Sequence, residues 1–585
     1  MNNSNRSRMA IFAIGFCIAL CLTGYYFAER PHHLLTYVWP MLEAQVFASN
    51  SYTADSNIHG PGGDITAQEF IDDWKVQDPD DYAQLMSAFI WSPLAGTFAG
   101  ILLLWLVGYL DSESTRMHHI RGRYLASQQN VSVAARRLYG KGSIMFDSLH
   151  FPELLEAQGL LFSGATGAGK TTAIMACLSI AIARQDRVIV TDQNGVLMAH
   201  YQPSNNILLL NPFDARTKNW SLLAEMKSIY DAPRLAKSTI PDAVGAESKQ
   251  WTMYAQQMLS AVLERLYLQG NATNADLLRY FRPEGQADLR SLLSGKTASA
   301  LFIPGNERLA ANVGGVLGMY LSPHEYLDPQ AGATSFSITR WIKEDHFSWL
   351  WLTYMEDQLD ALRPLIATWL DIASSAATSL SQVKRPAPGW QFWKKRVEPR
   401  RIWNVIDEAA SIGRIQSLEH SITVGRKAGL RTVIGIQSVS QLRELYGTNC
   451  TETILGSLKS AVIFNTEDPD TSEYLSKRVG DAEVELTSTS SGRAAHEFGN
   501  SHFGQNTHQT IRRVVLPSEI SALPNLNAYV VLSGVSAVAR IKLMPRELLT
   551  RIPTFIAKTN PPVPLAPTFP SVSSAPIPPK GPEFV

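Results

Sequence analysis

Residues Gly164 to Thr172 read Gly-Ala-Thr-Gly-Ala-Gly-Lys-Thr-Thr, and their types and spacing suit a loop that holds phosphate groups. They fit the pattern G-x-x-x-x-G-K-[ST], between an apolar run that predicts a strand and another that predicts a helix. Glycines at this spacing leave backbone N–H groups free to surround phosphate oxygens, and the helix N-terminus adds a favourable dipole. A Gly-rich turn without a ligand is the alternative. The sequence therefore predicts a nucleotide-binding loop made of Gly164, Ala165, Thr166, Gly167, Ala168, Gly169, Lys170, Thr171 and Thr172.

Four side chains carry the chemistry expected of such a loop. Lys170 should reach the β- and γ-phosphates of ATP, and the Thr171 hydroxyl should ligate Mg²⁺. The run Ile-Trp-Asn-Val-Ile-Asp-Glu, residues 402–408, places Asp407 and Glu408 where a predicted strand ends, and α/β sheets bind ligands at that edge. We expect Asp407 to hold Mg²⁺ through water and Glu408 to polarise the attacking water. A solvated acidic pair that begins the next helix is the alternative.

Two further residues are weaker candidates for a catalytic role. Gln437 ends the next predicted strand, where its carboxamide could sense the γ-phosphate, although a polar residue at that place is often only part of a turn. Arg426 lies in the run Gly-Arg-Lys-Ala-Gly-Leu-Arg, and a role as an arginine finger would require it to enter a neighbouring subunit's site. A basic helix end on the surface explains Arg426 equally well.

The elements that must position these residues follow an α/β pattern. Short β-branched or leucine-rich runs alternate with helical stretches, which is typical of a parallel sheet covered by helices. The predicted strands are 159–164, 187–192, 206–211, 401–407, 431–437, 460–465 and 527–534. A stretch with helical periodicity and little strand signal interrupts them from about 220 to 327. One sheet split by a helical insertion is therefore expected.

Three other segments stand out from this pattern. Residues 481–510 are rich in Ser, Gly, His and Asn and are predicted to form a long loop. The basic and aromatic run 384–400 is predicted to be a solvated loop, with a contact to nucleic acid or lipid as the alternative. The tail from Thr559 is dense in proline and nearly uncharged, which predicts a disordered or polyproline-like arm.

Two apolar runs near the N-terminus are predicted to span a membrane. Residues 9–28 are uncharged, and residues 89–110 form a second run of similar length; each is long enough for a bilayer core. A cleaved signal peptide is the alternative for the first run, and a buried core helix for the second. Acidic residues in the connecting loop 30–87 and arginines after the second run predict a multi-pass protein with both termini in the cytoplasm and residues 30–87 outside.

Charge and cysteine content narrow the remaining possibilities. The 585 residues carry 52 basic and 52 acidic side chains, so any nucleic-acid contact depends on a local patch such as Lys427 or residues 394–396. The four cysteines, Cys17, Cys21, Cys177 and Cys450, have neither metal-ligand spacing nor the pattern of a disulfide framework.

Together these motifs resemble the type IV coupling proteins, the family of TraD, TraG and TrwB. The resemblance rests on residues 164–172, on V-T-D-Q-N-G and L-L-N-P-F-D (190–195 and 209–214), and on I-D-E-A-A-S-I, G-R-K-A-G-L-R and G-I-Q-S-V-S-Q-L, and it covers most of 150–555. Gln193 stands where relatives often have proline. An acidic tail that some relatives use for docking is replaced here by the proline-rich arm, which leaves the docking partner open.

The resemblance implies a fold, a function and partners. The expected organisation is an anchor at 1–115, a RecA-like P-loop ATPase domain at 116–218 and 330–556, an all-α domain at 219–329 and a proline-rich tail at 557–585. The implied function is that of a homo-hexameric ATPase that uses ATP and Mg²⁺ to move DNA from a relaxase complex, or relaxosome, into a type IV secretion channel. The implied location is the bacterial inner membrane, as a multi-pass protein with a cytoplasmic catalytic domain. It matches Lys170, Thr171, Asp407 and Glu408 to the two nucleotide motifs, Gln437 to a third, and Arg426 to a trans-acting arginine.

Three other functions remain open from the sequence. A coupling ATPase that exports mainly proteins would share every catalytic residue. A chromosome translocase of the FtsK kind is disfavoured because no C-terminal winged helix is evident, and a scaffold with a decayed loop is disfavoured by the intact motifs.

Overall fold

The runs of branched and aromatic residues form strands in the computed structural model, and the chain divides into two units. The described residues are 39–41, 43–45, 57–60, 63–80, 83, 86–87, 97–98, 101, 118–202, 207–344, 346–380, 383–386, 395–398, 400–492, 502–545 and 549–559. One unit comprises 1–120 with 483–510, and the other comprises 121–482 with 511–585. The larger unit carries every predicted site residue.

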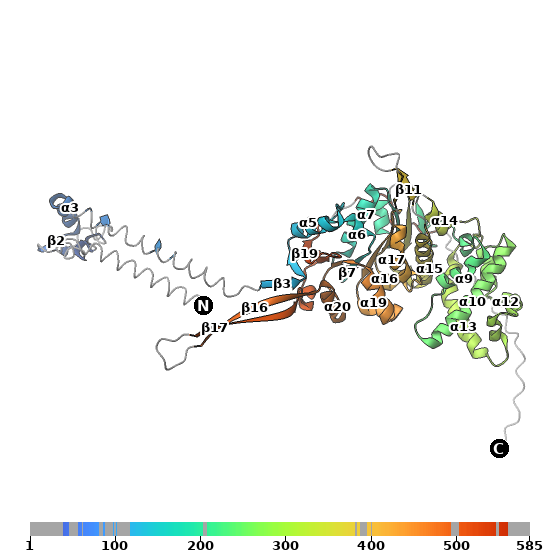
Figure 1. Ribbon diagram of the computed structural model, residues 1–585. Coiled ribbons are helices and arrows are strands. Elements are labelled where there is room, and N and C mark those ends of the chain that lie inside the picture. The colour runs from blue at the N-terminus through green and yellow to red at the C-terminus, as the bar shows by residue number, and fades with distance from the viewer. Residues whose placement is uncertain are drawn as a thin grey trace, which may run out of the picture. The chain divides into compact units, whose positions relative to one another are not determined.

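A ten-stranded sheet organises the larger unit, in the order β4-β19-β18-β15-β7-β14-β13-β8-β10-β9 (Figure 1). The strands from β15 to β9 run parallel to one another, whereas β18 pairs antiparallel with both β15 and β19. Parallel neighbours bring their carboxyl ends to one edge of the sheet, so that the loops after several strands can build one site. The strand bounds are β4 Tyr124–Ala126, β7 Leu160–Ser163, β8 Arg187–Gln193, β9 Leu208–Leu210, β10 Trp349–Tyr354, β13 Ile402–Ile406, β14 Leu430–Ile436, β15 Ser460–Ile463, β18 Asn527–Val531 and β19 Ala537–Lys542.

Alternate residues of the buried strands pack into two separate cores, one on each face of the sheet. In β13, Ile402 and Ile406 join one core while Trp403 and Val405 join the other. Helix α15 (Leu359–Thr378) packs in the first core and α7 (Lys170–Ala183) in the second. The other helices of this part are α5 Gln128–Tyr139, α6 Glu153–Glu156, α8 Val196–Tyr201, α16 Ala409–Ile412, α17 Leu418–Val424, α18 Val439–Tyr446, α19 Thr448–Ser457, α20 Pro469–Val479 and α21 Pro517–Ser521.

Between β9 and β10 the described residues form helices and short 3₁₀ turns but no sheet strand. The helices are α9 Ala232–Thr239, α10 Ala246–Gln269, α11 Asn274–Arg279, α12 Gln286–Leu293, α13 Glu307–Leu321 and α14 Ile338–Lys343, with the 3₁₀ helices η1 Leu222–Glu225, η2 Ile229–Asp231, η3 Pro283–Gly285, η4 Thr297–Phe302 and η5 Ser322–Tyr326. Their apolar side chains share the core of one sheet face. The domain boundaries drawn from the sequence remain predictions.

A buried carboxylate joins the beginning and the end of this helical segment. Glu225 accepts hydrogen bonds from Trp220 Nε1 at 2.9 Å, from Ser337 Oγ at 3.0 Å, and from the backbone N–H groups of Ile338 at 2.6 Å and Thr339 at 2.8 Å. Its four donors come from both connections to the sheet, so Glu225 holds the two connections together.

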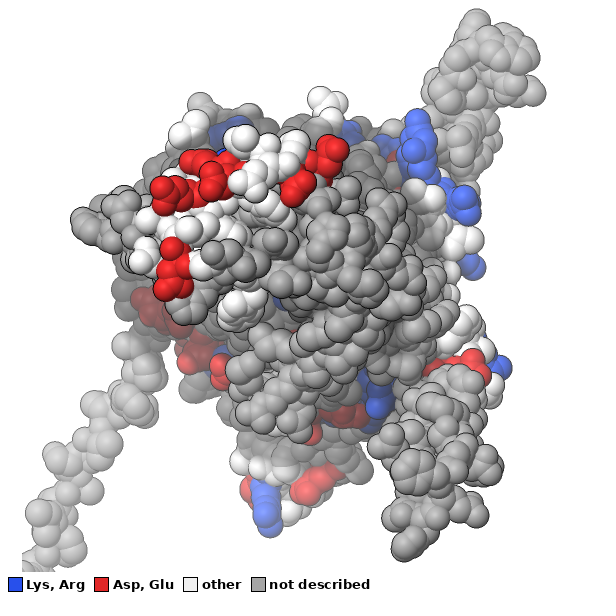
Figure 2. All heavy atoms as spheres, turned by 90° about the vertical axis from the view of Figure 1, so that its left-hand side faces the viewer, with Lys and Arg blue, Asp and Glu red and all other residues white. Residues whose placement is uncertain are grey.

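The smaller unit has its own small core. Strands β1 (Asn57–Gly60) and β2 (Gly63–Thr66) form an antiparallel hairpin, followed by α3 (Ala67–Gln77). Phe70, Ile71 and Trp74 of α3 are buried. The helix exposes Glu69, Asp72 and Asp73 on its other side. Acidic side chains gather at the front of the view in Figure 2.

The predicted membrane localisation is contradicted by the structure. A helix needs about 20 apolar residues to cross a bilayer. In the part of the chain that the structure describes, no helix is both long and apolar enough to do so. The predicted span 9–28 lies outside the described residues, and only 97, 98 and 101 of the span 89–110 are described.

The prediction of a long loop at 481–510 was wrong. The structure has two neighbouring strands there, β16 (Asp481–Gly492) and β17 (His502–Arg513), in a three-stranded sheet with β3 (His118–Gly122). Strands β11 (Val383–Pro386) and β12 (Lys395–Glu398) likewise form an antiparallel pair in the run predicted to be a solvated loop. A short hairpin, β5 Ile144–Phe146 with β6 Leu149–Phe151, completes the strands.

Candidate nucleotide-binding site

The predicted phosphate loop connects β7 to α7 and is fixed on both sides by neighbouring strands. Gly164 N–H donates to Ile436 O at 3.1 Å, and Ala165 N–H donates to Asn465 O at 2.8 Å. A Cβ at Gly164 would lie 2.6 Å from Cβ of Phe464, and Gly169 has a φ of 123°. Larger residues at these two positions would distort the loop. Thr166 and Gly167 at its tip are exposed, whereas Ala168 is buried and Thr172 half-buried.

Lys170 is buried at the start of α7 and folds back over its own loop. Its Nζ donates to Gly164 O at 2.6 Å and to Ala165 O at 3.2 Å. Burial lowers the pKa of Lys170, while the charges of Glu408 and Asp407 oppose this change. The ammonium group therefore already lies within the loop that is predicted to surround phosphates.

Thr171 and Asp407 come together across the carboxyl edge of the sheet. The Thr171 hydroxyl donates to Oδ2 of Asp407 at 3.4 Å, and burial raises the pKa of Asp407. Among the described residues, no group of three or more His, Cys, Asp or Glu side chains is placed to hold a metal ion. One hydroxyl and one carboxylate fit Mg²⁺, which usually keeps waters and takes its remaining ligands from nucleotide phosphates.

Glu408 is a buried carboxylate beside this pair. Burial raises the pKa of Glu408 to about 7, with a smaller contribution from Asp407, whereas Lys170 and Gln437 oppose the rise. Within the described part of the chain, neither carboxylate oxygen accepts a hydrogen bond of normal geometry. A buried polar group without a partner is costly and is expected to have a role, here the orientation of a water molecule.

Two residues of the quoted motifs to which the sequence analysis gave no role lie directly against Asp407. The backbone N–H of Asp407 donates to Thr191 Oγ1 at 3.3 Å, at the end of β8. Gly435 in β14 lies so close that a Cβ there would be 1.8 Å from the carbonyl oxygen of Asp407. Both contacts join neighbouring strands, so no local sequence pattern could have revealed them.

The structure brings Gln437 into the site but not Arg426. Gln437 is half-buried at the end of β14, which lies between β7 and β13, and it is near enough to Glu408 to affect its pKa. Arg426 is exposed on the short 3₁₀ helix η8 (Gly425–Ala428). In the described residues, no hydrogen bond or ion pair joins its side chain to the loop. The predicted role of Arg426 in a neighbouring subunit is untested by a single chain.

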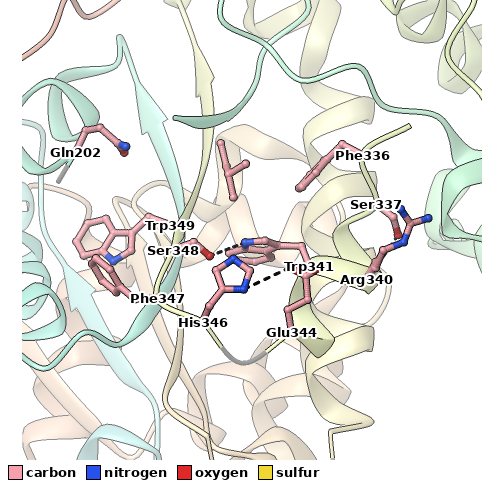
Figure 3. Close-up of a pocket in the computed structure, with 11 residues that line it drawn as sticks. Gln202, Phe336, Ser337, Arg340, Trp341, Glu344, His346, Phe347, Ser348 and Trp349 are labelled. Atoms are coloured by element: carbon pink, nitrogen blue, oxygen red, sulfur yellow. Dashed lines mark hydrogen bonds and ion pairs between the residues drawn. The ribbon is translucent and has the colours of Figure 1, made fainter. Parts of the chain in front are cut away.

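A cavity of about 330 Å³ lies near the opposite, amino edge of the sheet (Figure 3). Trp341 Nε1 donates to Ser348 Oγ at 2.8 Å on its wall, and His346 faces Glu344 at 3.6 Å. Its strand residues, Leu208 and Trp349, begin β9 and β10, whereas the nucleotide motifs follow the strand ends. The cavity is therefore separate from the predicted site.

The site and the sheet order define the class of protein. A glycine-rich loop after β7, paired acids after β13 and an intervening strand followed by Gln437 form the arrangement expected of a nucleotide site in a RecA-like P-loop fold. The family model described as "Type IV secretion-system coupling protein DNA-binding domain" matches residues 143–544. The chain therefore belongs to the type IV secretion-system coupling proteins, as its motifs predicted.

Individual relatives agree with this assignment. The coupling protein TraD of Escherichia coli K12 is 25% identical over 496 residues, which cover 81% of this chain but only 65% of TraD. The conjugal transfer protein TraG of Rhizobium radiobacter is 32% identical over 131 residues, 22% of this chain and 20% of TraG.

Solved structures are similar over a larger share of their length. The bacterial conjugative coupling protein TrwBdeltaN70, in an unbound form, is 31% identical and covers 76% of this chain and 97% of its own, with a TM-score of 0.65. The plasmid coupling protein TrwB in complex with ADP and Mg²⁺ is 30% identical and covers 76% and 98%, with a TM-score of 0.64.

Proposed function

We propose that this coupling protein binds ATP with Mg²⁺ and hydrolyses it to drive DNA transfer in conjugation. The observation that carries the proposal is the convergence of Lys170, Thr171, Asp407, Glu408 and Gln437 from separate segments at one edge of the sheet. The family match and the TrwB complex with ADP and Mg²⁺ support the choice of ligands.

Each of these side chains has a separate role in hydrolysis. Lys170 exchanges its two loop carbonyls for phosphate oxygens, because a phosphate is the stronger acceptor for an ammonium group. Thr171 and Asp407 hold Mg²⁺, which when bound neutralises phosphate charge. Glu408 orients a water molecule and accepts its proton, which suits a carboxyl group with a pKa near neutrality. Gln437, beside Glu408, is placed to sense the γ-phosphate.

Assembly and partners form a further part of the proposal. Arg426 is exposed and outside its own chain's site, so its catalytic contribution requires a second copy, as in a homo-hexamer. In such a ring the chain would receive DNA bound to a relaxase and pass it to a type IV secretion channel. The curated relatives are only partly covered by this chain, and their names support conjugal transfer as the process.

A trapped-nucleotide experiment tests the assignment of Glu408. The variant Glu408→Gln keeps the size of the side chain but cannot accept a proton, so it should bind ATP with Mg²⁺ normally and hydrolyse it at least about 100-fold more slowly. Glu356→Gln, at an exposed glutamate just after β10, is the matched control and should leave hydrolysis unchanged. Hydrolysis that survives in Glu408→Gln would refute this role.

A further inference from the structure

A groove in the helical segment is formed by α12, α13 and the turns next to them. It has a volume of about 670 Å³, and we call it the α12–α13 groove. Aromatic rings and aliphatic side chains line it together: Tyr280, Phe281, Leu289, Phe302, Val313 and Leu317. Phe281 and Phe302 are only partly buried, so their rings are accessible from the groove.

Two glycines keep one wall of the groove flat. Gly314 and Gly318 lie four residues apart, on one face of α13, and both line the groove. A Cβ at either position would meet no atom within 4 Å. Glycine weakens a helix interior relative to alanine, yet the described residues give no packing reason for it at these positions. A ligand whose backbone approaches α13 closely at Gly314 and Gly318 would explain both glycines.

Charges on the rim of the groove are few and of both signs. Arg282 pairs with Glu325 at 3.3 Å, and the guanidinium of Arg290 lies 5.2 Å from the centre of the Phe302 ring. The groove therefore suits a segment that is largely uncharged and can stack against aromatic rings.

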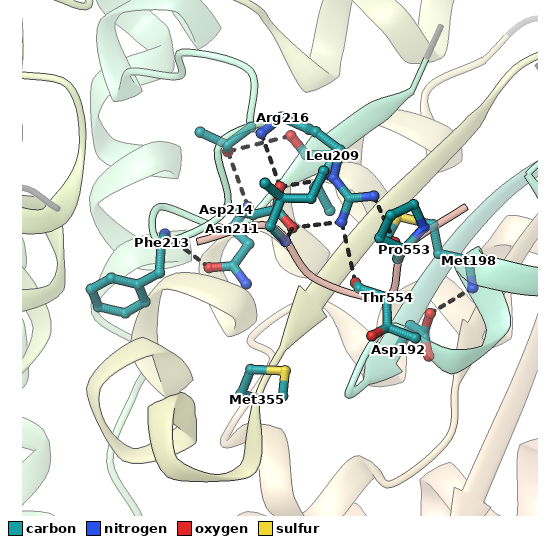
Figure 4. Close-up of polar contacts among 12 residues, drawn as sticks. Asp192, Met198, Leu209, Asn211, Phe213, Asp214, Arg216, Met355, Pro553 and Thr554 are labelled. Atoms are coloured by element: carbon teal, nitrogen blue, oxygen red, sulfur yellow. Dashed lines mark hydrogen bonds and ion pairs between the residues drawn. The ribbon is translucent and has the colours of Figure 1, made fainter. Parts of the chain in front are cut away.

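The C-terminal segment of the larger unit is fastened close to this groove. We call residues 551–558 the strap. Arg216 donates to Pro553 O at 2.7 Å and to Thr554 O at 3.2 Å, and its guanidinium is held by Asp214 at 2.7 Å (Figure 4). A Cβ at Gly195 would lie 2.3 Å from Thr554 O, so the strap passes directly over the loop after β8.

The end of the strap lies next to a helix that borders the groove. Lys558 N–H donates to Phe213 O at 3.1 Å. The Phe213 ring lies 4.9 Å from the ring of Tyr326, in η5, and Glu325 and Ser322 of the same 3₁₀ helix line the groove. The strap therefore ends near η5, the 3₁₀ helix that contributes Ser322 and Glu325 to the groove.

We propose that residues 560–585 of the same chain dock in the α12–α13 groove. These 26 residues contain nine prolines and only two charged side chains, Lys580 and Glu583. Proline-rich segments adopt extended helices that dock in aromatic-lined grooves, and a short tether gives an effective concentration of roughly millimolar. At about 3.1 Å per residue, Phe569 can reach about 34 Å from Lys558. Docking there would cover the aromatic side chains that line the groove.

Photo-crosslinking in the full chain tests this proposal. A benzophenone side chain replaces Phe569, and the crosslinked peptides are identified by mass spectrometry in a mixture of isotopically heavy and light chains. The expected product joins Phe569 to residues of the α12–α13 groove within one isotopic form. Crosslinks only to other surfaces, or only between heavy and light chains, would overturn the proposal.

Glycine substitutions provide the matched comparison. The double variant Gly314→Ala with Gly318→Ala should lower the crosslink yield by about fivefold or more, because the added methyl groups enter the groove. Gly315→Ala changes a neighbouring glycine of α13 whose Cβ would also meet no atom within 4 Å but which does not line the groove, so it should leave the yield unchanged. Both the double variant and Gly315→Ala should raise the melting temperature by about 1–3 °C, and such a rise would show that α13 is intact. An equal yield in both variants would contradict docking at this groove.

Discussion

Acid should weaken the helical segment through one buried histidine. His324 in η5 is almost inaccessible, its ring lies 6.0 Å from that of Trp220, and within the described structure neither ring nitrogen has a hydrogen-bond partner. Burial lowers the pKa of His324 from 6.5 to about 4. The unfolded chain takes up this proton at a higher pH than the folded chain. The contribution of neutral His324 to the free energy of unfolding is therefore complete above pH 6.5 and is lost as the pH falls toward 4. At about pH 5 the loss amounts to about 2 kcal/mol.

Thermal unfolding of the full chain at about pH 7.5 and pH 5, with and without His324→Leu, measures this effect. Other groups also titrate in that range. The quantity to compare is therefore the loss of unfolding free energy between about pH 7.5 and pH 5, in the variant and in the unmodified chain. The variant should lose about 2 kcal/mol less than the unmodified chain on acidification. His420→Leu, at an exposed histidine of α17, should show the full loss. If His324→Leu lost as much unfolding free energy on acidification as the unmodified chain, the reasoning would be refuted.

Three other substitutions test separate parts of the structure. Glu225→Ala leaves four buried donors unpaired and should cost roughly 3 kcal/mol or more in thermal or urea unfolding, whereas an unchanged stability would show that Glu225 does not join the two connections. Gly435→Ala should displace Asp407 and lower ATP hydrolysis by at least about tenfold, while Gly456→Ala, with no atom within 4 Å of its Cβ, should have no effect on the rate. Arg426→Ala should leave ATP binding unchanged but abolish hydrolysis in assembled rings; full hydrolysis in those rings would exclude a role in trans.

Much of the central sheet could be predicted because its strands are continuous apolar runs. The run 401–407 became β13 and the run 431–437 became β14, each within one or two residues. Strand β10 (Trp349–Tyr354) lies between the predicted helical stretch, which ends at about 327, and the predicted strand 401–407, and its short apolar run was not recognised as a strand. Strands β16 and β17 were missed because most of their residues are polar; Ala482, Val484 and Leu486 alternate with polar residues only at the start of β16.

The site could be predicted where its residues are adjacent in sequence. Lys170 with Thr171, and Asp407 with Glu408, are neighbours in short motifs whose spacing follows from phosphate and metal binding. Thr191 and Gly435 are single residues in other strands, and they reach Asp407 only through the order of the sheet. The strap was likewise beyond prediction, because Arg216 meets Pro553 across 337 positions of the chain.

The most direct test of the central claim is ATP hydrolysis by the full chain, with and without single- and double-stranded DNA, beside Lys170→Ala. Removal of the buried ammonium group should abolish ATP binding and hydrolysis, because it is the cation closest to the expected phosphates. The account predicts Mg²⁺-dependent hydrolysis that DNA stimulates by about tenfold or more and that Lys170→Ala eliminates. Hydrolysis that persists in Lys170→Ala, or that is the same with and without DNA, would contradict the account.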